Sequence, residues 1–381
     1  MGGDETTRRR FLTGVGATTT AGLAGCTGIP GLNGDDDEAV TLSDFRGSGP
    51  LVAGRPAPEG TSIEALPDLS GSLTLYLGGG ESGLYRRLFD LLRAEYPEFS
   101  LSVSSNDSAT LAQQIVNEHE AGALTGDVFL PVDAGSMGVV ADAGATTPLS
   151  TAVTDLVPET FRSPDRSWVG IEGRARAIPY NTDQLSDTDI PDSVAAFPDT
   201  TPLHGAMGWA PTYGAFQDFI TAMRLLRGRE ATKNWVTAMM DTQVARYPNE
   251  FFAAQAVADG AIDAAFTNHY YALRVQNANP DAPLELAFTQ GDAGALVNVS
   301  TAGVLANSGV EPLATNFIHH LLSAEAQEFF ATVTNGYPMI DGVTPLGDLP
   351  PLADLQPPDI DLTRLANLTP TLDLLREVGL L

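Results

Sequence analysis

Short apolar runs and amphipathic stretches alternate along the chain from about residue 72. The run LTLYL at 73–77 predicts a buried strand, and 83–96 predicts a helix because Leu84, Leu88 and Leu91 recur on one side. The alternation continues, with strands or helices predicted at 101–103, 109–121, 206–209, 214–226, 262–267, 296–299, 312–334 and 371–378. Such alternation favours an α/β fold with parallel strands. A folded part of about 280 residues favours two lobes over one.

The first 25 residues have the features of an export signal. Arg8 and Arg9 precede a weakly apolar stretch at 12–24, as in twin-arginine signals, and LAGC at 23–26 resembles a lipobox. The apolar stretch is too short to span a membrane. Cys26 is the only cysteine, which excludes internal disulfides and leaves lipidation as its expected use. A basic N-terminus with a chance cysteine is the alternative.

Two further segments lack hydrophobic periodicity. Residues 26–71 are rich in Gly, Pro and Asp, and they predict a flexible tether between the lipid and the folded domain. Residues 346–381 predict a C-terminal tail that is Pro-rich at first and ends in a short helix.

The charge balance describes the environment of the protein. The chain has 48 acidic and 20 basic residues, only one of them lysine, and a formal net charge of −28. Such a composition resembles that of proteins from extreme halophiles, where salt screens self-repulsion. We therefore expect salt to stabilise the fold. Without a basic patch to meet phosphates, nucleic acid is not an expected partner.

Two adjacent tyrosines, Tyr270 and Tyr271, follow a predicted strand. Asn268 is a good N-cap, so both tyrosines fall in the first turn of a helix, where anionic oxygens are favoured. Hard trivalent cations prefer oxygen ligands and lower the pKa of a bound phenol. The pair therefore suggests a ferric-ion site. Two packed aromatic residues without a ligand are the alternative.

A glycine loop points to a different chemistry. Residues 78–83 (GGGESG) satisfy G-x-G-x-x-G between a predicted strand and helix, and Asp107 lies near the distance expected for a ribose-binding acid. An exported nucleotide-dependent oxidoreductase is therefore an alternative. The catalytic patterns G-x-S-x-G and H-E-x-x-H and the Walker A loop are absent from the sequence.

Several local patterns occur in the order found in ferric-iron-binding receptors of ABC importers. They are LTLYLGGGES, GDVFLPVDAGSMGVVADAG, SWVGIEGRARAIPYNTDQL, GWAPTYGAF, TNHYYAL and NGYPMI. The chain from about 72 to 342 resembles this family. The resemblance implies a two-lobed periplasmic-binding-protein (type II) fold, with lobe one at 72–177 and 296–345 and lobe two at 178–295.

The resemblance also implies the ligands. Tyr213, Tyr270 and Tyr271 match the three tyrosine ligands of one branch of the family. Some relatives add a histidine and a glutamate from the first lobe, but those positions are Gly80 and about Val132 here. The neighbouring Glu81 and Asp133 are possible accessory oxygen ligands. The residues expected to hold a synergistic carbonate or phosphate are Gly214, Ala215, Asn268 and Arg176. A structural ion pair is the alternative for Arg176.

The function implied is capture of Fe(III) and its delivery to an ABC transporter permease, without catalysis. The protein is expected to be a monomer, exported by the twin-arginine pathway and lipid-anchored on the extracellular face of the cell membrane. A receptor of the same fold for an organic ligand, such as a phosphonate or polyamine, is the alternative. The tyrosines would then be aromatic walls.

Overall fold

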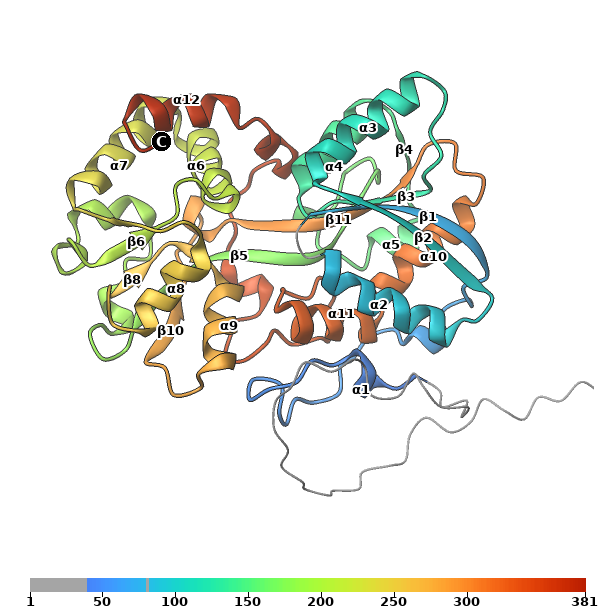
Figure 1. Cartoon of the computed structure of the whole chain (residues 1–381), viewed down its shortest axis with the longest axis horizontal. Coiled ribbons are helices and arrows are strands. Elements are labelled where there is room, and N and C mark those ends of the chain that lie inside the picture. The colour runs from blue at the N-terminus through green and yellow to red at the C-terminus, as the bar shows by residue number, and fades with distance from the viewer. Residues whose placement is uncertain (1–39, 80–81) are drawn as a thin grey trace, which may run out of the picture.

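Two long strands connect the two lobes of the molecule. The computed structural model describes residues 40–79 and 82–381. Strands β5 (Val169–Asn181) and β11 (Val297–Leu305) run antiparallel between the lobes, as Figure 1 shows. Nearly every residue of both strands is buried, and β5 also carries the charged residues Glu172, Arg174 and Arg176 at alternate positions.

Lobe one is built on a parallel sheet. Strand β1 (Gly71–Gly78) pairs in parallel with β2 (Phe99–Asn106) and β3 (Val128–Leu130), and β3 pairs antiparallel with β11. Its helices are α2 (Ser82–Glu95), α3 (Ser108–Glu120), α4 (Ala134–Asp142), α5 (Thr151–Thr154), α10 (Glu311–Leu321) and α11 (Ala324–Phe329). A two-residue strand, β4 (Thr146–Thr147), joins the edge of β11.

Lobe two repeats this arrangement with shorter strands. Strand β6 (Met207–Trp209) pairs in parallel with β7 (Ala245–Arg246) and β8 (Ala264–Ala265). Three elements of this lobe, β8, β9 (Thr267–Asn268) and β10 (Leu284–Ala287), pair antiparallel with β5. Its helices are α6 (Gly214–Arg227), α7 (Arg229–Asp241), α8 (Glu250–Ala258) and α9 (His269–Ala278).

The predicted α/β architecture with parallel strands is confirmed, and two predicted elements are divided. The strand expected at 262–267 consists of β8 and β9. The helix expected at 312–334 ends at Leu321, and Ser323 starts α11 by accepting a hydrogen bond from Ala326 N (3.2 Å). A π-helical turn, Phe330–Thr334, follows and ends at Asn335 in the left-handed conformation (φ 63°).

The segment expected to be a tether is instead folded where it is described. Residues 40–70 form α1 (Leu42–Phe45) and a 3₁₀ turn (Ile63–Ala65), with Phe45, Ile63 and Leu69 buried. The prediction was wrong because these apolar residues are widely spaced and show no periodicity. The export signal and Cys26 lie outside the described residues.

The C-terminal residues are also packed on the body. They form two 3₁₀ turns, η8 (Leu352–Leu355) and η9 (Leu362–Ala366), and the helix α12 (Thr369–Glu377). Val52 from the N-terminal segment and Leu346 from the C-terminal segment share a small apolar core with Leu273 of α9. Among the described residues, no helix is long and apolar enough to cross a membrane.

Candidate metal centre in the cleft between the lobes

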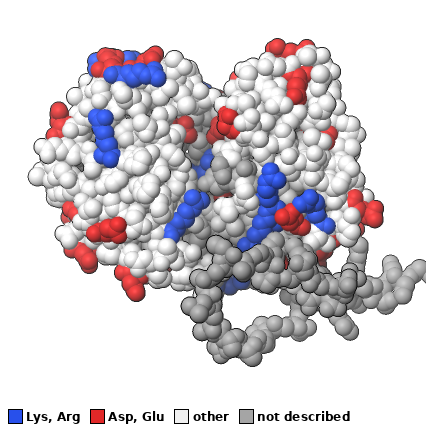
Figure 2. Space-filling model, in the orientation of Figure 1, with Lys and Arg blue, Asp and Glu red and all other residues white. Residues whose placement is uncertain are grey.

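A cavity of about 650 Å³ lies between the lobes, where Figure 2 shows a notch in the surface. Helices α3, α4 and α6 all begin at its wall, so their partly positive N-terminal ends face the same space. The polar and charged lining includes Ser108, Asp133, Arg174, Arg176, Tyr213, Asp218, Asn268, Tyr270 and Asn298. This combination favours a ligand that carries negative charge.

Tyr213 and Tyr270 line this cavity, and the ring of Tyr271 packs against both of them. Tyr213 immediately precedes α6, and the other two occupy the first turn of α9. The hydroxyls of Tyr213 and Tyr271 are hydrogen-bonded to each other, and the ring centroids of Tyr270 and Tyr271 are 4.3 Å apart. Tyr270 and Tyr271 are only 4% and 7% exposed. The structure thus brings together the three phenols singled out in the sequence.

The phenol of Tyr271 is neutral when no cation is bound. Burial raises the pKa of Tyr271 well above its ordinary value of 10, and the neighbouring Tyr270 and Tyr213 raise it further. A hard cation would reverse this preference, because it stabilises the phenolate and displaces the proton. The group can therefore supply oxygen ligands to a metal in exchange for protons.

The first turn of α9 is fixed to the crossing strand β5. The imidazole nitrogens of buried His269 lie 3.3 Å from the carbonyl oxygen of Ala175 and 2.8 Å from that of Asn335. Burial lowers the pKa of His269 to about 4, so the ring is neutral at pH 7. This histidine holds the turn that presents Tyr270 and Tyr271.

Asn268 occupies the predicted N-cap position of α9, but its side chain does not cap the helix. Its Oδ1 accepts a hydrogen bond from Arg176 (3.1 Å), and its Nδ2 donates to the hydroxyl of Tyr270 (3.4 Å). Asn268 therefore links the predicted anion-binding arginine to the tyrosine group.

Arg176 forms the structural ion pair that was the alternative considered for it, and one of its donors remains at the cavity wall. Its Nη1 donates to Glu250 Oε1 at 2.5 Å, and the other oxygen of Glu250 accepts from Asn268 N at 2.7 Å. Burial raises the pKa of Glu250, and Arg176 opposes this rise. Arg176 is 4% exposed, and its second nitrogen, Nη2, is buried without a hydrogen-bond partner among the described residues. A buried guanidinium donor at a cavity wall is suited to an anionic ligand.

The other predicted anion-binding residues lie at the same wall. Gly214 and Ala215 line the cavity at the start of α6. Tyr213, the N-cap residue, makes no side-chain hydrogen bond to this helix end, so its first N–H groups lack a side-chain cap.

The positions in lobe one considered for accessory ligands do not present a free metal-binding side chain where they are described. Gly80 and Glu81 lie outside the described residues. Val132 lines the cavity with an apolar side chain. Asp133 also lines it, but its carboxylate accepts hydrogen bonds from the backbone N (2.6 Å) and Oγ (3.0 Å) of Ser136 as the cap of α4. Its geometry is therefore that of a helix cap at the rim of the site.

Four polar residues of the site were not anticipated from the sequence. Asp218, on α6, accepts a hydrogen bond from Asn298 on the crossing strand β11 (3.1 Å). Arg174 lies two residues before Arg176, on the same side of β5. The guanidinium of Arg274 lies over the rings of Tyr270 (4.9 Å) and Tyr271 (5.5 Å). Of these four residues, only Arg274 could have been found from the sequence. It lies four residues after Tyr270 and three after Tyr271, and residues at these spacings contact each other on a helix.

The glycine loop has a packing explanation. Gly79 has φ 84°, and a Cβ there would lie 2.3 Å from the side chain of Val132. Asp107 caps α3 by accepting from Thr110 N at 2.8 Å. Glycine at 79 is thus needed for close approach of two loops, whatever the cavity binds.

Two α/β lobes, two crossing strands and a polar cavity between them define a solute-binding receptor. The sequence profile of the family described as bacterial extracellular solute-binding proteins matches residues 90–354. The chain belongs to this family. Its members bind solutes and are not enzymes, so the oxidoreductase alternative loses its support.

Individual relatives are similar in sequence and structure. The Fe(3+)-binding periplasmic protein of Serratia marcescens is 31% identical over 291 residues, which cover 74% of this chain and 83% of that protein. Iron uptake protein A2 of Synechocystis is 32% identical over 57% of this chain; the match spans 66% of that protein. The structure of iron-bound HitA from Pseudomonas aeruginosa superposes with a TM-score of 0.69 at 28% identity, covering 81% of this chain and 99% of that one. The resemblance to ferric-iron-binding receptors is confirmed.

Proposed function

We propose that this protein captures ferric ion in the cleft through Tyr213, Tyr270 and Tyr271. The observation that carries the proposal is the contact between the hydroxyls of Tyr213 and Tyr271, with Tyr270 packed against the same pair. Three phenolates balance the charge of Fe(III), which makes a buried site electrostatically acceptable. The named relatives, which are ferric-iron-binding proteins, support the same assignment.

An anion completes the proposed site. Arg176 Nη2, the N-terminus of α6 at Gly214 and Ala215, and Asn268 lie around one part of the cavity. Carbonate or phosphate held there would occupy coordination positions that the tyrosines leave open. Glu81 and Asp133 would then be dispensable, so Ala at either position is expected to leave iron affinity almost unchanged.

Export and delivery to a permease are part of the same proposal. The Arg8–Arg9 pair and the LAGC sequence support twin-arginine export and lipidation of Cys26. The iron-loaded monomer would then be delivered to an ABC permease at the extracellular face of the membrane. Replacing Cys26 with Ser should release the protein from the membrane fraction, and an unchanged fraction would count against lipidation.

Iron titration with visible spectroscopy tests the proposal. The wild-type protein should develop the red-orange charge-transfer band of iron phenolate. Tyr213→Phe, Tyr270→Phe and Tyr271→Phe should each weaken binding sharply, because Phe keeps the ring and removes the donor oxygen. Tyr247→Phe is the matched control, since Tyr247 packs near this group but has not been assigned as a ligand.

The outcomes separate the alternatives. No band in the wild type, together with binding of a phosphonate or polyamine, would replace the ferric site by an organic one. A band that survives all three substitutions would place the metal elsewhere. Titration with and without carbonate or phosphate tests the anion, and equal affinities would remove it from the site.

A further inference from the structure

The C-terminal residues 359–381, called here the C-terminal strap, contact both lobes beside the cleft. Turn η9 packs mainly on α4 of lobe one and also contacts α6 of lobe two, and α12 packs on α6 and α7 of lobe two. Figure 1 shows the strap in red, passing from beside α4 to the top of the other lobe. The whole strap lies beyond residue 354, where the match to the family profile ends.

On lobe one, the strap is seated by close backbone approach. A Cβ at Gly138 would lie 2.4 Å from the Cβ of Thr363, and one at Gly135 would lie 2.7 Å from the nitrogen of Ala366. Asp361 caps η9, because its Oδ1 accepts from the nitrogen (3.0 Å) and the Oγ1 (2.6 Å) of Thr363. Helix α4 thus has glycines at the two places where the strap touches it.

On lobe two, the strap is held by polar contacts. Thr371 is fully buried; its hydroxyl is hydrogen-bonded to that of Thr221 (2.8 Å) and accepts from Arg224 Nε (3.2 Å). Glu377 forms ion pairs with Arg229 (2.5 Å) and Lys233 (2.6 Å). These exposed ion pairs add little individually, so the buried threonine pair is the stronger attachment.

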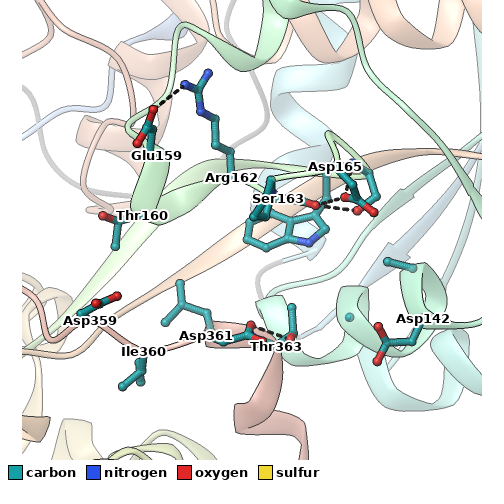
Figure 3. Close-up of a pocket in the computed structure, with 16 residues that line it drawn as sticks. Asp142, Glu159, Thr160, Arg162, Ser163, Asp165, Asp359, Ile360, Asp361 and Thr363 are labelled. Carbon is teal, nitrogen blue, oxygen red and sulfur yellow. Dashed lines mark hydrogen bonds and ion pairs between the residues drawn. The ribbon is translucent and has the colours of Figure 1, made fainter.

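The charges near the start of the strap do not stabilise its contact with lobe one. A pocket of about 570 Å³ separates the start of the strap from lobe one. Figure 3 shows that carboxylates line both of its sides, with Asp359 and Asp361 from the strap and Asp142, Glu159 and Asp165 from lobe one. No ion pair joins the strap to lobe one within the part of the chain that the structure describes. The seat on lobe one therefore depends on packing, with Leu362 and Leu365 buried.

The link between the two seats is very short. Only Asn367 and Leu368 separate η9 from α12. Fully extended, the path from Ala366 to Thr369 spans at most about 11 Å. Leu365, Ala366 and Leu368 also line the ligand cavity. The lobes cannot move far apart at this edge while both seats hold.

We propose that the C-terminal strap limits the opening of the cleft and forms one wall of the ligand cavity. Wide opening requires the strap to leave one of its two seats, because the link between them is too short to extend. This inference depends on the two-lobed fold and not on the identity of the ligand.

The test measures the distance between the lobes in ligand-free protein by double electron–electron resonance. Spin labels are placed at Asn117→Cys on α3 and Arg227→Cys on α6, both exposed, in a Cys26→Ser background. Inserting Gly-Ser-Gly-Ser between Asn367 and Leu368 lengthens the link by about 13 Å and preserves both seats. The distance distribution should extend to values longer by several ångströms, up to about 10 Å.

Matched controls identify the cause. The same insertion after Gly309, an exposed loop position, should leave the distribution as in the parent. Gly138→Val, which removes the lobe-one seat, should broaden the distribution as the insertion does. Gly309→Val should not, because no atom lies within 4 Å of a Cβ at that position.

Two results would overturn the proposal. One is a distribution for the strap insertion that coincides with that of the parent. The other is equal broadening by the control insertion at Gly309. Because no iron is added, either result leaves the proposed ferric site to be judged by its own titration.

Discussion

Replacing Asp218 with Asn should stabilise the protein at pH 8 and have no such effect at pH 4. The carboxylate of Asp218 faces the ligand cavity. Its pKa is raised from the ordinary value of 3.8 to about 7, mainly by burial and also by the charge of Asp133, while Arg174, Asn298 and Arg176 oppose the rise. Asn can still accept the hydrogen bond from Asn298 through its Oδ1.

The magnitude follows from this pKa difference. A change from 3.8 to about 7 corresponds to about 4 kcal/mol of unfavourable free energy for the ionised form. Asp218 is partly open to the water-filled cavity, which we take to reduce this to about 2 kcal/mol. For a protein of this size, Asp218→Asn should then raise the melting temperature by about 4 °C.

The ionisation of Asp218 determines how the effect of the substitution on stability changes with pH. Below about pH 4, Asp218 is protonated in both the folded and unfolded states, so its ionisation costs nothing. Between about pH 4 and pH 7 the unfolded chain ionises first, and the stability of the wild type falls as pH rises. Above about pH 7 the cost is complete, and this is where the substitution gains most.

Thermal unfolding at pH 4, 6 and 8, at one fixed and high KCl concentration, checks this reasoning. Asp241→Asn, at an exposed position on α7, removes the same formal charge and serves as the control. An Asp218→Asn gain that is equal at pH 4 and pH 8 would show that burial of the charge is not the cause. A gain matched by Asp241→Asn would attribute the effect to net charge alone.

Three further outcomes are expected. Glu250→Gln leaves Arg176 without its buried ionic partner, so the free energy of unfolding, measured by urea denaturation, should fall by about 3 kcal/mol; an unchanged value would refute the importance of this pair. Arg274→Gln removes a cation from the faces of two tyrosine rings and should weaken iron binding in calorimetric titration by about 1 kcal/mol, roughly fivefold, whereas Arg274→Lys should retain most of the affinity. The melting temperature should rise with KCl up to molar concentrations, since the Debye length shortens from about 10 Å at 0.1 M to about 3 Å at 1 M; a flat response would contradict the role given to charge repulsion.

The parts of the site predictable from sequence are those that depend on local rules. Asn268 marks the start of α9, and this places Tyr270 and Tyr271 in its first turn. Glu250 could not be found in this way. It is 18 residues from Asn268 and 74 from Arg176, and no local pattern indicates that a glutamate on α8 will be buried against them.

The ends of the chain show where periodicity fails as a guide. Phe45, Ile63 and Leu69 are too far apart to define a helix or strand, yet each is buried on lobe one. Arg46 and Arg55 both donate to the buried carboxylate of Glu328, more than 270 positions away in the chain. A segment held by a few widely spaced buried residues can have the composition of a flexible linker and still be packed on a folded domain.

In the proposed capture of iron, the net charge of the protein acts at long range, whereas the groups in the cavity act on the ligand by direct contact. The net charge of −28 attracts cations at a distance, but at molar salt the field decays within about 3 Å. Selection of the ligand must then rest on groups in direct contact with it. The cavity supplies these in both signs, with arginines on β5 for an anion and phenols at the starts of α6 and α9 for a cation. A cleft that presents both arginines and phenols to one ligand is suited to a ferric ion accompanied by its counter-anion. It should bind either ion alone more weakly.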